Sequence, residues 1–75
     1  MALLENVAKN LHRVRLRKNF SQRDVADKAG VSVSYVSMLE RGNRSPPLET
    51  IEVLAKALGV APLSLFEPAE SRARR

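Results

Sequence analysis

The stretch SQRDVADKAGVSVSYVSMLERG (Ser21–Gly42) carries the start signals of two short helices and the turn that joins them. Ser21 is a favourable N-cap residue, and Asp24 follows it by three positions, so the pair predicts a capping box. Apolar residues then recur at the spacing of one helix face. This pattern predicts a helix over Gln22–Ala29.

A glycine and a second cap predict the turn and the next helix. Gly30 stands where a chain leaving a helix commonly adopts a left-handed conformation, which glycine tolerates without strain. Ser32 is the next N-cap, and Gly42 ends the helix that follows. Val36 and Leu39 form an apolar pair at i, i+3 on its inner face. Two helices joined by so short a turn must cross steeply, a layout typical of a DNA-reading helix-turn-helix.

The second of these helices keeps an outward face that has no core to bury. At about 100° per residue, this face lies opposite the inner apolar pair. Its members are Ser34, Ser37, Met38 and Arg41, with Val33 and Tyr35 on the flanks. Serine can bond base edges in a major groove, and Val or Met can touch thymine methyl groups. The alternative is the solvated face of a small helical bundle. The two caps, the glycine turn and the glycine stop together favour DNA reading.

Length and composition limit what the chain can do. At 75 residues we expect one domain, and its core must be aliphatic because only two Phe and one Tyr are aromatic. There is no cysteine, which excludes a disulfide framework or a thiolate metal site. His12 alone cannot hold a metal, so we expect it on the surface. No catalytic set is visible, which makes an enzyme a remote interpretation, and we expect no metal, cofactor or small-molecule ligand. Without a signal-peptide core or a membrane-spanning apolar run, we expect a cytoplasmic chain with no membrane partner.

Positive charge gathers at the end of the first predicted helix, Leu3–Lys18. The net charge of +5 is compatible with a polyanionic partner but is weak evidence by itself. The inner stripe of this helix is Leu4, Val7, Leu11 and Val14, and its last turns are rich in arginine. Cations there suit the negative end of the helix dipole. The functional alternative is that Arg13 and Arg17 face a DNA backbone, with Arg17 the better candidate.

Two further segments are expected to contact phosphates. Gln22 begins a helix whose free N–H groups suit an anion, and Arg23 can join it on the backbone, although a merely solvated Gln22 is equally consistent with the local sequence. The loop after the second helix offers Asn43, Arg44 and Ser45 as donors. Loops of this composition are common, so the signal is the position of the loop beside the outward face.

The remaining chain predicts two more helices and a partner surface. The fourth helix is Leu48–Leu58, which Pro47 opens at the first position and Gly59 ends. Its core stripe is Leu48, Ile51, Leu54, Ala55 and Leu58. A short fifth helix follows over Ala61–Phe66, with Pro62 at its start. Val53, Ala57 and Leu63 fall outside the core stripe, and such an apolar patch on a small domain predicts a homodimer interface.

Three segments together resemble the Cro/lambda-repressor-type helix-turn-helix, also called the xenobiotic-response-element (XRE) family. They are SQRDVADKAGVSVSYVSMLERG, NRSPPLETIEVLAKALGV and PLSLF. The match runs from about Leu11 to Phe66. The resemblance implies an all-α, compact five-helix domain that binds operator DNA, usually as a two-fold dimer. It implies that Gln22 clamps phosphate and that an Arg15–Glu40 pair ties the first helix to the third. The base-reading positions that it implies are Val33, Ser34, Ser37 and Met38, with Tyr35 near the backbone.

One departure from the family pattern bears on specificity. Some phage repressors carry glutamines on the reading face, whereas this chain has Val33, Ser34 and Met38 there. We therefore expect fewer bidentate base contacts, and a larger share of specificity from apolar contact and DNA shape.

The leading functional interpretation is a transcriptional regulator that binds double-stranded DNA as a dimer, as phage repressors and restriction–modification controller proteins do. Its half-sites would lie about 34 Å apart. Residues 1–68 would form the DNA-binding domain, and 69–75 a frayed basic tail that adds non-specific attraction. The alternative from another class is an antitoxin-type interaction module, in which the Val53, Ala57 and Leu63 patch caps a toxin.

Overall fold

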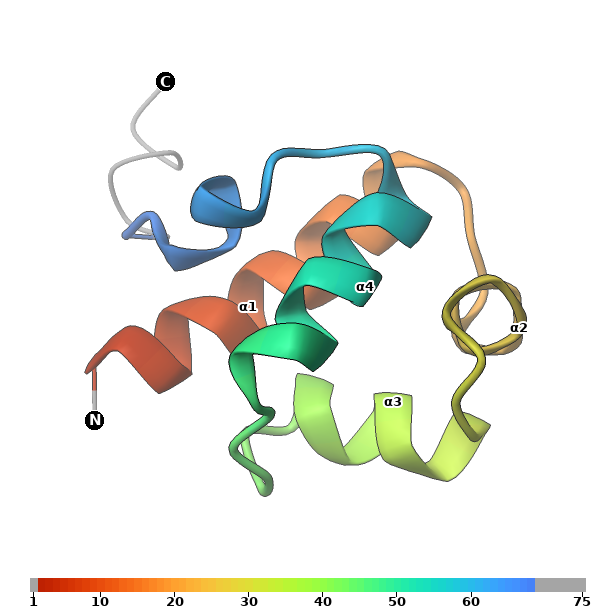
Figure 1. The fold of residues 1–75 in the computed structure, drawn as a ribbon, viewed down its shortest axis with the longest axis horizontal. Helices are drawn as coiled ribbons and strands as arrows, with labels where there is room; N and C mark the ends of the chain where they lie inside the picture. Colours follow the sequence, from red (N-terminus) through yellow and green to blue (C-terminus); the bar gives the residue numbers. More distant parts are fainter. Residues whose placement is uncertain (1, 69–75) are drawn as a thin grey trace.

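The structure, a computed structural model, describes residues 2–68, with side chains from residue 3 onward. Its elements are α1 (Ala2–Arg17), α2 (Gln22–Ala29), α3 (Val33–Glu40), α4 (Leu48–Leu58) and the 3₁₀ helix η1 (Pro62–Phe66). In Figure 1, α4 crosses in front of α1, and α3 lies below both. No strand occurs in the described part of the chain. The tail expected over 69–75 lies outside it.

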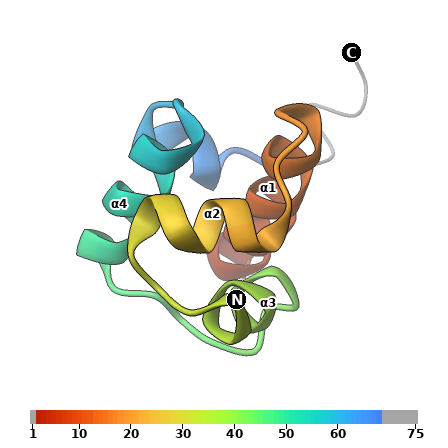
Figure 2. The same ribbon diagram turned by 90° about the vertical axis from the view of Figure 1, so that its right-hand side faces the viewer.

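The start and stop signals act as expected around α2 and α3. Ser21 Oγ accepts a hydrogen bond from the Asp24 N–H (2.9 Å), and Asp24 Oδ2 accepts one from the Ser21 N–H (2.8 Å), which completes the capping box. Gly30 is left-handed, with φ +73°, and Ser32 Oγ caps α3 by accepting from the Tyr35 N–H (3.0 Å). Figures 1 and 2 each show one of the two helices end-on and the other from the side, so the helices cross steeply.

The core is built where the four α-helices meet, and it is aliphatic as predicted. One cluster takes two buried residues from each helix: Leu11, Val14, Val25, Ala26, Val36, Leu39, Leu54 and Leu58. A second, smaller cluster joins α4 to η1 through Ile51, Ala55 and Leu65. These contacts hold the inner side of α3 against the core and leave its opposite side open.

Three expectations for the C-terminal half need correction. Leu48 was expected in the core stripe of α4 but is 71% exposed, because it is the first residue of the helix and lies beyond the core. Pro47 is the N-cap of α4 rather than its first residue, since its ψ of 159° is extended. The expected fifth helix, Ala61–Phe66, is the 3₁₀ helix η1, in which the Ser64 N–H donates to the Ala61 carbonyl three residues back.

A buried asparagine attaches η1 to α1. Asn10 is 1% exposed, and its Nδ2 donates to the carbonyls of Leu65 (2.8 Å) and Glu67 (2.7 Å). Its Oδ1 accepts from Nη2 of Arg13 (2.7 Å). Because buried polar groups need partners, this amide holds the last element at a set position on the first helix. Nothing in the sequence pattern pointed to it.

Candidate nucleic-acid interface

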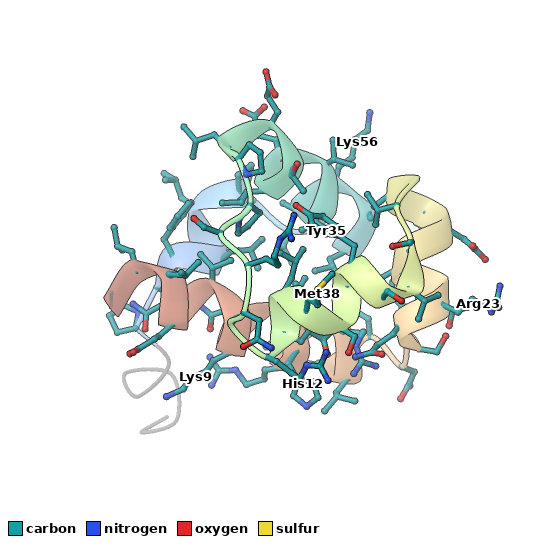
Figure 3. All side chains as sticks on the ribbon, turned by 90° about the horizontal axis from the view of Figure 1, so that it is seen from below. Lys9, His12, Arg23, Tyr35, Met38 and Lys56 are labelled. Carbon is teal, nitrogen blue, oxygen red and sulfur yellow. The ribbon has the colours of Figure 1, made fainter. Side chains whose placement is uncertain are left out.

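The face of α3 predicted to read DNA is open to solvent. Val36 and Leu39 are 0% and 2% exposed and hold the helix against the core. Figure 3 looks at the molecule from the side of α3, with Met38 and Tyr35 labelled along it. The members of the open face are Val33 and Ser34, which are exposed, Ser37 and Met38, which are half-buried, and the exposed Arg41. The packing that would have removed Ser34, Ser37 and Met38 from solvent does not occur.

Tyr35 lies on the flank of this face. It is half-buried and packs against the core cluster, on the side of α3 that faces α4 (Figure 3). This packing fixes the position of the tyrosine ring. That placement is compatible with the backbone contact expected for it, which remains a prediction.

A buried carboxylate fixes the C-terminal end of α3 to two other helices. The Glu40 side chain is 4% exposed, and Arg15 Nε of α1 donates to its Oε2 over 2.6 Å. Oε1 accepts hydrogen bonds from Nη2 of Arg15 (3.1 Å) and Nε2 of Gln22 (3.1 Å). Nδ1 of His12 lies 2.9 Å from the same oxygen. Arg15 also donates through Nη1 to the Phe20 carbonyl (2.8 Å). The pair implied by the family resemblance is thus present, as part of a larger network that joins α1, α2 and α3.

The network decides the ionisation of Glu40. Burial alone raises the pKa of this carboxyl, but hydrogen bonds from Arg15, His12 and Gln22 and the positive charge of Arg15 outweigh that effect. The pKa of Glu40 therefore lies below its ordinary value of 4.5. At neutral pH the carboxylate is charged, which is the state that the three donors require.

The network includes two residues for which the sequence predicted no such partner. His12 was expected to be a plain surface residue, and its side chain is 51% exposed, yet its ring is held by Glu40. Gln22 was expected to contact phosphate or to be merely solvated, and the structure adds a hydrogen bond from its side-chain amide to the same carboxylate oxygen. The i, i+3 spacing of His12 and Arg15 on α1 is the sequence signal that could have predicted a shared partner.

The other expected phosphate contacts come from three segments. Arg17 at the end of α1 and Arg23 of α2 are exposed, and Figure 3 shows Arg23 pointing away from the body of the domain. The loop 43–45, which follows α3, is exposed throughout. Arg13, the weaker candidate on α1, donates through Nη2 to Asn10 Oδ1.

The residues expected at a dimer interface fall into two places. Val53, 43% exposed, and Ala57 line a shallow hollow together with Lys28 and Lys56, between α2 and α4. Leu63, 79% exposed, belongs to η1 and does not line this hollow. The sequence reasoning missed a second apolar hollow of about 160 Å³, whose lining includes Leu3, Leu4, Pro46, Leu48 and Phe66.

A steeply crossed helix pair whose second helix keeps an open face, as α2 and α3 do here, defines a helix-turn-helix DNA-binding domain. The helix-turn-helix family pattern matches residues 11–65. The chain belongs to this family, in its XRE type, whose members are DNA-binding transcriptional regulators.

Individual relatives agree with this assignment. The chain is 39% identical to the uncharacterized HTH-type transcriptional regulator y4dJ of Sinorhizobium fredii, over 93% of this chain and 91% of that protein. The chain is 36% identical in sequence to the hypothetical transcription factor NHTF from Neisseria. The two folds superpose with a TM-score of 0.88 over 96% of this chain and 83% of the NHTF chain in its crystal structure. The restriction-modification controller protein C.Esp1396I, solved as a tetramer with its natural 35 base-pair operator, is 31% identical, with a TM-score of 0.79 over 85% of this chain and 84% of that one.

Among residues 2–68, every helix is too short or too polar to cross a bilayer.

Proposed function

We propose that this chain is a sequence-specific transcriptional regulator that binds operator DNA as a homodimer, with α3 of each copy in a major groove. The observation that carries the proposal is the open face of α3, which is supported from behind by the core and at its end by the Glu40 network. A helix that is fixed on one side and exposed on the other presents its side chains in a set register. The similarity to C.Esp1396I, which was solved in complex with its operator, supports operator DNA as the ligand.

Two groups of residues have different roles in this proposal. Base edges are read by Val33, Ser34, Ser37 and Met38, through serine hydroxyls and through apolar contact with thymine methyls. The phosphates are held by Gln22, Arg23, Tyr35, Arg17, Asn43, Arg44 and Ser45. The second group fixes position and orientation but carries no sequence information.

The division into readers and phosphate contacts has a direct test. Selection of bound duplexes from a random library gives the operator sequence, and a palindrome within it reveals the two-fold dimer. Ser34→Ala or Ser37→Ala should then change preference among sites, by about 1–3 kcal/mol for a good base contact. Equal loss on random DNA would show that these serines are not readers.

The salt dependence of binding distinguishes residues that contact phosphate from residues that contact bases. Gln22→Ala or Arg44→Ala should weaken binding to all duplexes alike. For Arg44→Ala, the slope of log K against log salt should fall by about one unit, because one counterion fewer is released. An unchanged slope would argue against Arg44 as a phosphate contact, and an altered site preference would argue against Gln22.

We propose that the dimer forms on α4, where Val53 and Ala57 offer apolar surface beside Lys28 and Lys56. A small domain has a thin stability margin, which a second copy would increase. Val53→Glu should therefore shift sedimentation toward monomer. Leu16→Glu is the matched control, because Leu16 is similarly exposed at 53% but lies on α1. A Val53→Glu chain that sediments like the wild type would exclude this surface.

The toxin-capping alternative draws on the same patch. The relatives described above are regulators and a controller protein, so they favour the transcriptional role.

A further inference from the structure

We propose that His12 is an additional contact to the DNA backbone, and that it binds phosphate only when its imidazole is protonated, so that DNA binding takes up one proton. The inference rests on the proposed function and adds to it a residue and a dependence on pH. It comes from the side-chain network around Glu40.

The first step assigns the proton on Nδ1. This nitrogen lies 2.9 Å from Glu40 Oε1 and 3.3 Å from Arg15 Nη2. It cannot accept from Arg15 and donate to Glu40 at once. A lone pair held 2.9 Å from a carboxylate oxygen would be repelled, so the shorter contact assigns the hydrogen to Nδ1. In the neutral ring, Nε2 then carries a lone pair and no hydrogen.

The second step places the other edge of the ring. Nδ1 is directed at a carboxylate that is 4% exposed, whereas the His12 side chain is 51% exposed. The edge that bears Nε2 therefore faces outward. Figure 3 shows His12 beside α3, on the side of the molecule from which the open face is seen. Glu40 also holds Gln22, so His12 and a proposed phosphate clamp share one anchor on the same flank of α3.

The third step is the chemistry of phosphate, which accepts hydrogen bonds but donates none when ionised. A neutral ring with its hydrogen on Nδ1 would present a lone pair to phosphate. A proton taken from solvent onto Nε2 gives the ring two donors, one for Glu40 and one for the DNA backbone. The N–H bond on Nε2 is the one covalent bond that forms in this step.

Charges around the ring act in opposite directions. Among the described residues with recorded contacts to the ring, Arg15 on α1 disfavours a positive charge on the imidazole and Glu40 on α3 favours it. Gln22 on α2 binds the same carboxylate and is neutral. A DNA phosphate adds a second anion next to Nε2. By linkage, a site that gains protons on binding must bind DNA more weakly as the pH rises.

The experiment uses the full chain and a random-sequence duplex of about 30 base pairs, long enough for two half-sites. Kd is measured by fluorescence anisotropy between about pH 5.5 and 8, the range in which histidine titrates, at fixed ionic strength. For the wild type, Kd should rise with pH, at most about tenfold per unit for one linked proton. His12→Gln should bind more weakly at the acid end and lose the pH dependence that the wild type shows.

Two variants separate charge from titration. His12→Lys keeps a cation at all these pH values and should bind with a flat profile, near the wild-type affinity at the acid end. Lys9→Gln removes another basic side chain of α1, labelled near His12 in Figure 3, and should leave the pH profile of the wild type in place. An NMR titration of the His12 ring adds an independent measure, because its midpoint should move to higher pH when the duplex is present.

The outcomes distinguish the two proposals. Three results would each overturn the role of His12 and leave the proposed function standing. They are duplex binding by the wild type with no pH dependence, a His12→Gln chain that keeps the wild-type pH profile, and an NMR midpoint that DNA does not move. Absence of binding to any duplex, at the acid end and in dilute salt, would instead overturn the proposed function.

Discussion

Replacing Glu40 by alanine removes the anion that α1, α2 and α3 share, and we expect a large loss of stability. The side chains of the Arg15–Glu40 pair are 10% and 4% exposed. Without the carboxylate, Arg15 becomes a buried cation that keeps the Phe20 carbonyl as a partner (2.8 Å). Breaking a buried ion pair in this way costs about 3–5 kcal/mol, because an uncompensated charge is left behind.

That loss is large for a domain of this size. At about 0.05–0.15 kcal/mol per residue, a 75-residue chain has a free energy of unfolding of about 4–11 kcal/mol. Each kcal/mol moves the melting temperature of a small domain by about 4–8 °C, so we expect a fall of at least about 12 °C.

The assay is urea unfolding followed by circular dichroism, with two comparison variants. Glu40→Gln keeps an acceptor oxygen for Arg15 but loses the charge, so it should fall between the wild type and Glu40→Ala. Glu52→Ala removes an exposed carboxylate of α4 and should change stability by less than about 0.5 kcal/mol. If Glu40→Ala lost less than about 1 kcal/mol, the pair would behave as a surface ion pair, and the reasoning from burial would be refuted.

Three further predictions follow from local structure. The pKa of Glu40 is lower in the folded chain than its ordinary value of 4.5. The ionised carboxylate therefore stabilises the fold at pH values above 4.5, and this contribution is lost as the pH falls below 4.5. Urea midpoints should therefore drop less on acidification for Glu40→Gln than for the wild type, and equal drops would contradict the shift. Ser21→Ala removes the acceptor of the α2 capping box and should cost about 1 kcal/mol in thermal unfolding; no change would mean that Asp24 alone suffices. Gly30→Ala should cost about 1–2 kcal/mol although its Cβ would meet no atom within 4 Å, because φ is +73°, and a neutral result would contradict this backbone origin.

The amino-acid sequence by itself determined the boundaries of α2, α3 and α4. Ser21, Gly30 and Ser32 act on backbone groups within a few residues of themselves, so their effect does not depend on the rest of the fold. The inner pair Val36 and Leu39 was predictable for a similar reason, since helix periodicity fixes which residues share a face. The residues on the opposite face follow from the same geometry, and their roles on DNA remain predictions.

Only the tertiary structure decided which faces are covered and which side chains share a partner. Periodicity placed Leu48 on the core stripe, but it could not show that the core ends before the first residue of α4. The contact between His12 and Glu40 joins residues 28 apart in the sequence, and that between Gln22 and Glu40 joins residues 18 apart. Such contacts depend on how three helices pack, because a spacing rule reaches only along one helix and cannot place a side chain of another helix beside it.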